Sequence, residues 1–465
     1  MRPRVTVIMR WAHFQRQEHT WNVHRLSRTR ADGFSGMEVV FLGTSAGGPQ
    51  ATRGTTAIAM RLAGHSQVGG HTWLFDCGEG TQRQLLSSTL SHAGIDRVFV
   101  SHMHGDHVWG LASVAISTLL EQGNDTPRSL HVYGPVGLHS LLVSMLACAR
   151  CKLGASEVVV HELVDGDDEK VAEVPYFVSE QEQPTVTREQ LDPDDDGVWH
   201  LYEDAHFQVR AARVRHTAPC FGFVVDEKPR KLRIDAKRAT EAGLPPGKDY
   251  RRLQAGNDVA LDDGTIVRAA DVTLPPVPAR RVAVVGDTCR PSKEFCAIAN
   301  GADVVVHEAT MADEDRERAL ARGHSTPSMA GKVARDIDAG LLVLTHFSGR
   351  FVQPRSSAAR DREEGAPPSV TVDGLVSQAR RAFRSDSVIA AHDFLCLSVP
   401  IGGFTPMPPN YLRSNAYAKN PARRHQNNSQ YHHRRDDVDD VRSTRPPRQN
   451  ASSHHRPRSY YSPHR

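Results

Sequence analysis

Residues 101–107 read Ser101-His102-Met103-His104-Gly105-Asp106-His107, which places three histidines and one aspartate within six consecutive positions. The apolar run at 98–100 precedes them and predicts a buried strand that ends where the polar residues begin. Side chains two positions apart share a face of an extended chain. The first two histidines can therefore address one cation, and Asp106 with His107 a second cation about 4 Å away. The stretch predicts a binuclear metal site.

Two cations need more donors than this cluster supplies, so further ligands must come from elsewhere in the chain. Four later segments place a metal-type side chain directly after an apolar run. They are Arg215-His216-Thr217, Gly286-Asp287-Thr288, His307-Glu308-Ala309-Thr310 and Thr345-His346-Phe347-Ser348. Any one of them alone is more often a packed histidine or a capping aspartate. Four in order behind the cluster favour ligands held at strand ends.

The ends of the chain differ in composition from its middle. Residues 1–36 carry seven arginines against two acids, and residues 403–465 carry 12 Lys and Arg against four Asp without an apolar period. Because these ends contribute +5 and +8 to a whole-chain charge of +3, residues 37–402 carry about −10. We expect a disordered basic tail and an acidic body that suits divalent cations, with a core drawn from the 39% hydrophobic content.

The sequence contains no run of 18 apolar residues and no secretory signal. Seven scattered cysteines fit a reducing compartment better than a disulfide framework. Cys148 and Cys151 form a Cys-x-x-Cys without a second pair, which we interpret as structural and helical. We expect a soluble intracellular protein without a membrane partner, in the cytoplasm or nucleus. The Arg-rich N-terminus leaves a mitochondrial location open, although Glu18 weakens the match.

Apolar patterns divide the middle of the chain into strands and helices. Strands are predicted at residues 39–42, 55–62, 73–75, 98–100, 130–133, 207–214, 221–225, 281–285, 304–306 and 341–344. Helices are predicted at 108–122 and 136–149. The early strands favour antiparallel hairpins. Two strand-rich halves, each followed by helices, predict two sheets packed face to face with helices outside and metal ligands along one edge.

Three polar segments interrupt this pattern. Residues 165–204 and 353–368 are rich in charged residues, Ser and Pro, and are predicted to be loops. Residues 228–252 carry nine Lys and Arg and three acids around Pro245-Pro246-Gly247. An ordinary solvated loop and a basic arm that grips phosphates both fit this composition.

A set of motifs carries a resemblance over residues 37–401. They are Phe41-Leu42-Gly43-Thr44-Ser45-Ala46-Gly47, Phe75-Asp76-Cys77-Gly78-Glu79-Gly80-Thr81-Gln82, the cluster at 101–107, Tyr133-Gly134-Pro135, Gly286-Asp287-Thr288, His307-Glu308-Ala309-Thr310, His324-Ser325-Thr326, Thr345-His346-Phe347-Ser348 and Asp393-Phe394. The combination resembles ribonuclease Z, the tRNA 3′-processing endonuclease of the metallo-β-lactamase superfamily. The resemblance implies an α/β fold, the αββα four-layer sandwich of that superfamily, at residues 37–402, with a protruding substrate-binding arm at 226–272.

The resemblance also implies two zinc ions per chain, for which Mn²⁺ or Mg²⁺ could substitute. The implied ligands are His102, His104 and His216 on one zinc, and Asp106, His107 and His346 on the other, with Asp287 bridging. Asp106 would also accept a proton, and Glu308 and His324 would pass one to the leaving 3′ oxygen. Asp76 fits either a group that orients the histidine cluster or a turn cap.

In the short form of ribonuclease Z, the arm clamps precursor tRNA held by the other subunit of a homodimer, and residues 228–252 fall where that arm lies. The candidate RNA-binding residues are Lys228, Arg230, Lys231, Arg233, Lys248, Arg251 and Arg252. The tip at 245–248 departs from the family's Gly-Pro-rich pattern, which puts the mode of grip in doubt.

The resemblance therefore predicts a zinc-dependent endoribonuclease that removes the 3′ trailer from precursor tRNA. The tRNA would keep a 3′ hydroxyl and the trailer a 5′ phosphate. One alternative is a hydrolase of small phosphodiesters or thioesters, against which the arm argues because a small substrate needs no basic projection. Another is a catalytically silent RNA-binding relative, which would hold fewer than two metals per chain.

Overall fold

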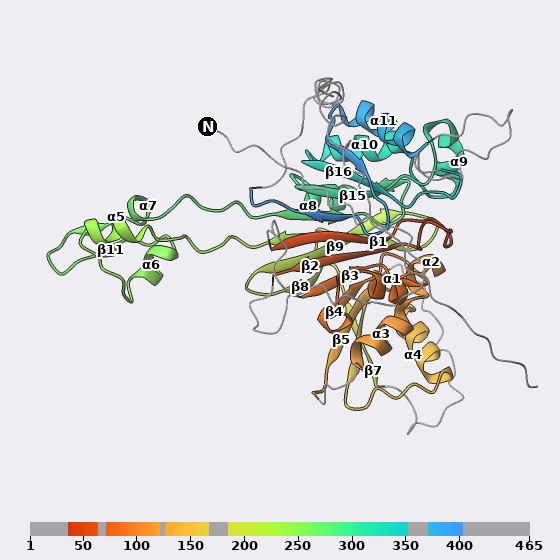
Figure 1. Ribbon diagram of the computed structural model, residues 1–465, viewed down its shortest axis with the longest axis horizontal. Coiled ribbons are helices and arrows are strands. Elements are labelled where there is room, and N and C mark those ends of the chain that lie inside the picture. Colours follow the sequence, from red (N-terminus) through yellow and green to blue (C-terminus); the bar gives the residue numbers. More distant parts are fainter. Residues whose placement is uncertain (1–35, 64–70, 121–125, 167–184, 352–370, 403–465) are drawn as a thin grey trace, which may run out of the picture. The chain divides into compact units, whose positions relative to one another are not determined.

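The computed structural model describes residues 36–63, 71–120, 126–166, 185–351 and 371–402. Two sheets form its centre (Figure 1). The first sheet has the strand order β18 (Cys396–Ser398), β1 (Met37–Gly43), β2 (Ala57–Leu62), β3 (Thr72–Phe75), β4 (Ile95–Phe99), β5 (Ser129–Pro135), β6 (Glu157–Leu163) and β7 (Val186–Leu191). The second has the order β14 (Arg290–Pro291), β9 (Phe207–Arg215), β10 (Cys220–Glu227), β13 (Arg281–Val284), β15 (Val304–Glu308), β16 (Leu341–Thr345) and β17 (Val388–Ala390), with β8 (Trp199–Glu203) paired to β9.

Helices cover the outer face of each sheet. The helices that lie in the chain between strands of the first sheet are α1 (Thr81–Ser87), η1 (His92–Gly94), α2 (Gly105–Val108), α3 (Leu111–Leu119) and α4 (Leu138–Cys148). Those between strands of the second sheet are α8 (Lys293–Ala299), η3 (Asp313–Asp315), α9 (Arg316–Ala321), α10 (Pro327–Asp336) and α11 (Val372–Phe383). Three separate apolar cores lie between the four layers, one between the sheets and one under each set of helices. The predicted αββα sandwich is confirmed.

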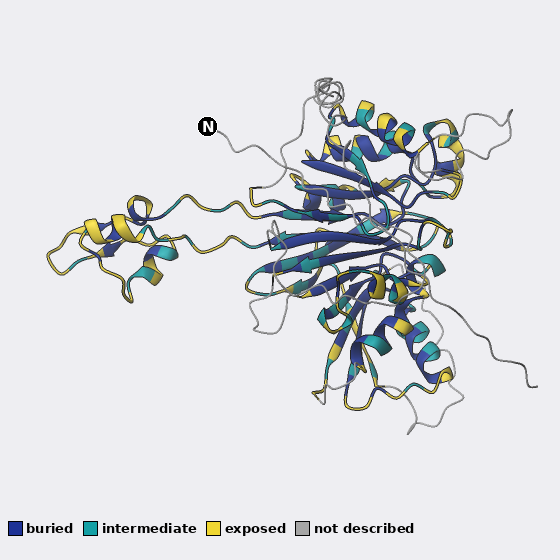
Figure 2. Ribbon diagram, in the orientation of Figure 1, coloured by how far each residue is buried: buried dark blue, intermediate teal, exposed yellow. Residues whose placement is uncertain are grey.

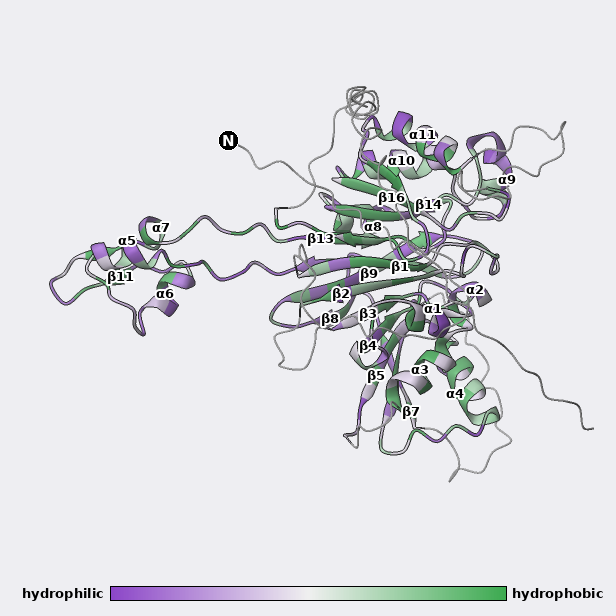
Figure 3. Ribbon diagram, in the orientation of Figure 1, coloured by the Kyte–Doolittle hydropathy of each residue, from purple (hydrophilic) through white to green (hydrophobic). Residues whose placement is uncertain are grey.

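Strand β1 shows why the sequence forms this sandwich. Met37, Val39 and Phe41 pack into the core between the sheets, whereas Val40 and Leu42 pack into the core under the helices. A strand that is buried on both faces requires a continuous apolar run rather than alternation. Figure 3 shows the resulting hydrophobic strands at the centre of the molecule, and Figure 2 shows that they are buried.

The strand directions agree with the expectation of early hairpins. Strands β1, β2 and β3 pair antiparallel, and β3 to β7 continue the sheet in parallel pairs. The prediction of one continuous helix at residues 108–122 is wrong, because the chain turns between α2 and α3. Gly110 lies at this turn, where a Cβ would lie 2.2 Å from the carbonyl oxygen of Gly78.

The prediction that residues 165–204 form only a loop is wrong, because β7 and β8 lie within this segment. Strand β7 is the last strand of its sheet, and most of its side chains are exposed, so its composition resembles that of a loop. Cys151 lies beyond the end of α4, so the Cys-x-x-Cys is not wholly helical; all seven cysteines are free. The insert at 353–368 and the tail at 403–465 lie outside the described residues, as do residues 1–35 and 167–184. No helix in the described ranges is long and apolar enough to cross a bilayer.

Residues 228–280 leave the sandwich between β10 and β13 and form the arm, which Figure 1 shows projecting on two extended segments. The arm contains α5 (Ala236–Glu241), α6 (Tyr250–Gln254), β11 (Val259–Ala260), β12 (Ile266–Val267) and α7 (Ala269–Val272). These elements enclose a small apolar core of their own, which includes Leu244, Leu253 and Val259. An ordinary solvated loop has no such core, so this segment is a folded arm, and its binding of phosphates stays a prediction. Its return segment, 273–280, extends beyond the predicted range.

A buried ion pair joins the two ends of the arm where they meet the sandwich. The Arg280 guanidinium donates from Nε to Glu227 Oε2 at 2.6 Å and from Nη2 to Glu227 Oε1 at 3.0 Å. Its Nη1 donates to the carbonyl of Val399 at 2.9 Å. Both side chains are buried, and such a bidentate pair has a fixed geometry. The base of the arm is therefore held in a defined position on the sheet.

Candidate metal centre

The candidate ligands lie where strands of both sheets end. His102 and His104 follow β4, and Asp76 follows its parallel neighbour β3. In the second sheet, the pairings of β9 with β10 and of β10 with β13 are antiparallel, so β9 runs parallel to β13, β15 and β16. The residues after these four strands, which include His216 and His346, therefore meet at one edge. This is why positions so far apart in the sequence converge.

Two groups of donor atoms form at this edge. In the first, His104 Nδ1 lies 3.0 Å from His102 Nε2 and 3.3 Å from His216 Nε2. In the second, His346 Nε2 lies 3.3 Å from His107 Nε2 and 3.4 Å from Asp106 Oδ2. Within each group, the donor atoms all lie within 4.8 Å of one another.

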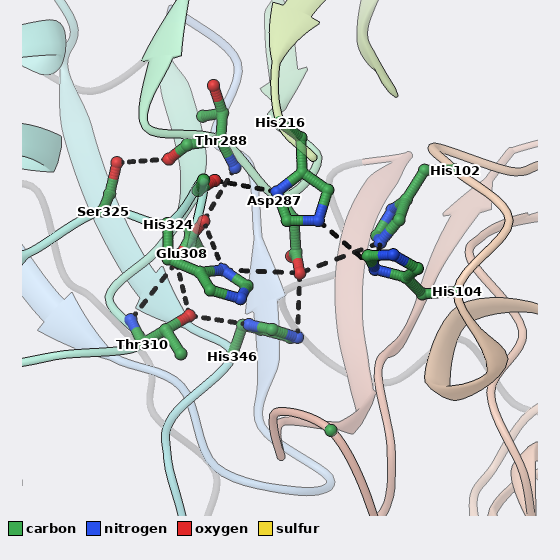
Figure 4. Close-up of polar contacts among 12 residues, drawn as sticks. His102, His104, His216, Asp287, Thr288, Glu308, Thr310, His324, Ser325 and His346 are labelled. Carbon is green, nitrogen blue, oxygen red and sulfur yellow. Dashed lines mark hydrogen bonds and ion pairs between the residues drawn. The ribbon is translucent and has the colours of Figure 1, made fainter. Parts of the chain in front are cut away.

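Asp287 lies between the two groups. Its Oδ2 is 3.9 Å from His102 Nε2 on one side, and 3.6 Å from His107 Nε2 and 3.3 Å from His346 Nε2 on the other. Figure 4 shows the Asp287 carboxylate pointing toward the imidazoles of His346 and His102. A carboxylate in this position can contact two cations at once.

The outer nitrogens of the imidazoles determine which nitrogen is available to a metal. His216 Nδ1 donates to the carbonyl of Gly323 at 2.8 Å, and His107 Nδ1 donates to Asp76 Oδ2 at 2.7 Å. His346 Nδ1 lies 2.8 Å from the hydroxyl of Thr310. With Nδ1 engaged, the lone pair on Nε2 is directed into the cluster, as in metal-ligating histidines.

This donor set fits zinc. Imidazole nitrogens and carboxylates are its usual ligands, and unprotonated nitrogens 3.3 Å apart repel one another unless a cation lies between them. Burial, aided by neighbouring histidines, lowers the pKa of His102 well below its ordinary value, which keeps the imidazole neutral for binding. Asp287 and Asp106 add carboxylate oxygens, which zinc also accepts.

Glu308 and His324 form a second polar pair beside the donor groups. His324 Nδ1 lies 3.1 Å from Glu308 Oε1 and 3.7 Å from Asp287 Oδ2. Glu308 is buried, and its Oε1 also accepts the backbone N–H of Thr288 at 2.7 Å. Burial opposes protonation of His324, but the Glu308 carboxylate raises the pKa of His324 to about 9. The imidazolium can therefore serve as a proton donor near neutral pH.

Known proteins are similar to this chain over most of its length. Ribonuclease Z of Gloeothece citriformis is 34% identical over 366 residues, which cover 78% of this chain and 96% of that protein. Zinc phosphodiesterase ELAC protein 1 of Mus musculus is 35% identical over 373 residues, which cover 78% of this chain and 99% of that protein. The chain belongs to the ribonuclease Z family.

A solved structure agrees with this assignment. The crystal structure of human tRNase Z, short form, matches with a TM-score of 0.52 and 28% identity, over 78% of this chain and 100% of that chain. The family model described as anti-Pycsar protein Apyc1 matches residues 37–146. That range spans β1 to α4, and it includes the histidine cluster of this ribonuclease Z but none of the later ligand segments.

Several groups at this ribonuclease Z site had no role in the sequence prediction. The backbone N–H of Gly47 donates to Asp106 Oδ2 at 2.7 Å. The Thr310 hydroxyl contacts both His346 and Glu308, and the Gly323 carbonyl orients His216. These residues lie in or beside the quoted motifs, so the motifs were the available signal. Backbone groups of this kind have no residue-type signature, which is why they were missed.

The two residues Asp76 and His346 adopt positive φ values of 58° and 55°. This conformation is uncommon for residues other than glycine and costs about 1–3 kcal/mol when the surroundings impose it. Asp76 accepts the Ser101 backbone N–H at 2.7 Å as well as contacting His107. Asp76 thus contacts both the backbone and a histidine of the cluster, and its predicted orienting role stays a prediction.

The basic residues of the ribonuclease Z arm lie far from the donor groups. The arm leaves β10 at Glu227, whereas His216 precedes the opposite end of the same strand, at Cys220. Seven residues of extended chain at about 3.4 Å each separate these ends by roughly 24 Å. The arm residues are thus not part of the cluster.

Not every basic residue of the arm is available to a partner. Lys228 Nζ pairs with Glu203 at 2.5 Å, and Arg230 Nη2 pairs with Glu227 at 2.6 Å. Five other candidates are exposed and make no ion pair within the described residues. These five, the free arm cations, are Lys231, Arg233, Lys248, Arg251 and Arg252. These five, rather than Lys228 and Arg230, have side chains that are available to contact phosphate groups.

Proposed function

We propose that this chain is the zinc-dependent endoribonuclease that removes the 3′ trailer from precursor tRNA. Cleavage falls just past the discriminator nucleotide and leaves a 3′ hydroxyl on the tRNA and a 5′ phosphate on the trailer. The observation that carries the proposal is the convergence of seven donor side chains at one edge of the sandwich, beside the Glu308–His324 pair. An RNA phosphodiester placed there meets every group that its hydrolysis requires.

The proposed ligand assignment follows the two donor groups. His102, His104 and His216 would hold one zinc, Asp106, His107 and His346 the other, and Asp287 would contact both. When bound, two zinc ions polarise a phosphodiester and lower the pKa of an attacking water.

The protein's own residues handle the protons. The Asp106 carboxylate, whose Oδ2 lies 3.4 Å from His346 Nε2, is placed to accept a proton from the attacking water. The Gly47 N–H fixes its orientation. His324, protonated because Glu308 stabilises its charge, is placed to donate a proton to the departing 3′ oxygen.

We propose that the arm binds precursor tRNA and that the protein acts as a homodimer. The separation of roughly 24 Å between the arm's base and the cluster, estimated from strand length, supports this. The arm projects from the sheet end that lies away from His216, so its free cations belong to a segment that leads away from their own cluster. An RNA bound at the cluster of a second subunit is a target that such an arm can reach.

We also propose an intracellular location. Seven free cysteines, two of them buried, support a reducing compartment. The choice among cytoplasm, nucleus and mitochondrion remains a prediction that residues outside the described ranges would decide.

Cleavage of a precursor tRNA transcript, labelled separately at each end, tests the proposed function. We expect one cut, with a 3′ hydroxyl on the tRNA and a 5′ phosphate on the trailer. Hydrolysis of bis(p-nitrophenyl) phosphate without any cut in the transcript would support a small-substrate hydrolase instead. Retention of the transcript without turnover of either substrate would indicate a silent RNA-binding relative.

A further inference from the structure

The surface beside the metal centre carries one exposed aromatic side chain. Trp109 is 61% exposed, and it is the only exposed Phe, Trp or Tyr among the described residues. The other two tryptophans in these ranges, Trp73 and Trp199, are each 1% exposed. An indole exposed to water does not gain the free energy of burial. An exposed tryptophan is therefore a candidate for contact with a ligand.

The indole of Trp109 is fixed against the backbone of the ligand cluster. A Cβ on Gly105 would lie 2.3 Å from Cε2 and Cζ2 of the Trp109 ring, so the ring occupies the space above the glycine. Gly105 is the residue between His104 and Asp106. One side of the indole therefore contacts the backbone between a donor of the first group and a donor of the second.

The backbone of Trp109 is held as firmly as its ring. Its N–H donates to the carbonyl of Gly105 at 3.0 Å, and the following N–H, of Gly110, donates to the carbonyl of Cys77 at 2.9 Å. Gly110 also packs directly on the backbone of Gly78. The exposed ring is thus a preorganised flat surface and loses little conformational entropy when a ligand covers it.

An unpaired base is the ligand that fits such a surface. Proteins grip single-stranded RNA by stacking bases on exposed aromatic rings, and this contact tolerates any sequence because every base has a π-face. If the proposed function holds, the scissile phosphate lies at the donor groups, and the nucleotides on either side of it belong to the unpaired 3′ strand. We propose that Trp109 stacks on the base of a nucleotide that adjoins the scissile phosphate.

Three substitutions separate aromatic stacking from simple apolar contact. Trp109→Phe keeps a π-face, Trp109→Leu keeps an apolar side chain without one, and Trp109→Ala keeps neither. Stacking is worth about 1–3 kcal/mol per base, which corresponds to roughly 5- to 150-fold in affinity. We expect the Leu and Ala variants to raise KM for precursor tRNA by that factor, and the Phe variant to raise it by less than about threefold.

In the Leu and Ala variants, the factor by which kcat/KM falls for precursor tRNA should be at least five times the factor by which it falls for bis(p-nitrophenyl) phosphate. Equal losses on both substrates would mean that Trp109 only supports the fold of the metal centre, and would overturn the proposal. A Leu variant with the same KM for precursor tRNA as the Phe variant would overturn the proposal as well.

An abasic nucleotide identifies the stacked base. Transcripts carrying an abasic site immediately 5′ or 3′ of the cleaved bond are compared in the parent protein and in Trp109→Ala. At the stacked position, the loss in kcat/KM caused by the abasic site and the loss caused by Trp109→Ala should not add, because either change alone removes the same contact. Additive losses at both positions would contradict the proposal. A change of molecular mass in solution on Trp109→Ala would overturn it as well, because the ring would then belong to an interface between copies.

A binding measurement keeps this inference separate from the proposed function. A five-nucleotide oligoribonucleotide should quench tryptophan fluorescence in the parent protein and not in Trp109→Phe. If the parent cuts no precursor tRNA, the proposed function fails, yet quenching that depends on Trp109 still supports stacking. If it cuts precursor tRNA but quenching is the same in both proteins, the stacking inference fails alone.

Discussion

Replacing the arm with a tight turn tests how this enzyme recognises RNA. Glu227 and Arg280 face each other at the ends of β10 and β13, and the Glu227 N–H donates to the Arg280 carbonyl at 2.8 Å. A two-residue Asn-Gly turn can join such adjacent antiparallel strands. The variant therefore lacks residues 228–279 but keeps the buried Glu227–Arg280 pair. The arm's core is removed whole, so no apolar fragment is left exposed.

The size of the effect follows from the five free arm cations. If each neutralises one phosphate, at about 0.9 units of salt slope per phosphate, the slope of log kcat/KM against log salt concentration becomes shallower by about 4.5. Five exposed ion pairs at about 0.2–1 kcal/mol each also predict a loss in kcat/KM of roughly 5- to 5,000-fold. Hydrolysis of bis(p-nitrophenyl) phosphate should change little, since roughly 24 Å of strand separates the arm's base from the donor groups.

The assay measures kcat/KM for a precursor tRNA transcript between 50 and 200 mM salt, with the small phosphodiester run in parallel. A variant with the five free arm cations changed to Ala should reproduce most of the effect. Its matched control changes Lys237 and Arg238, which pair with carboxylates inside the arm. An unchanged salt slope, or equal losses on the two substrates, would refute the reasoning.

Three further predictions concern the site and the base of the arm. Asp287→Ala should abolish turnover of precursor tRNA and of the small phosphodiester together, and normal turnover of either would contradict the bridging position. Asp76→Asn, which tolerates the positive φ, should weaken zinc binding about 10- to 100-fold in a chelator competition; unchanged affinity would leave Asp76 a turn cap. Glu227→Gln breaks a buried pair and should lower the free energy of unfolding by about 3–5 kcal/mol. Burial raises the pKa of Glu227, but Arg280 and Arg230 overcome this and lower it below 4.5, so the difference from the parent should be constant above pH 4.5 and shrink as the pH falls further. A difference that grows in acid would contradict this.

Much of the sandwich could be predicted because its strands are buried on both faces. Apolar runs such as 39–42 and 304–306 can be recognised as strands from their composition. The ligand positions follow directly after such runs. The seven side chains proposed as ligands do gather in space, as their placement after strands predicted. Parallel strand direction is what converts this spacing in sequence into proximity.

Features that depend on tertiary contacts could not be predicted in this way. Strand β7 has polar, exposed side chains and is held by hydrogen bonds to β6, which composition does not record. The arm was recognised from its charge, yet only the structure separates Lys228 and Arg230, which pair with Glu203 and Glu227, from the cations that are free. The orienting contacts from Gly47 and Gly323 come from backbone groups. Trp109 gave no signal at all, since exposure is a property of the fold.

The zinc content of the purified protein is the most direct test of the account. Mass spectrometry under non-denaturing conditions should find two zinc ions per chain in the parent, and fewer in both His216→Ala and His346→Ala, since each removes a donor from a different group. One zinc or none per chain in a preparation that cleaves precursor tRNA at full rate would contradict the account.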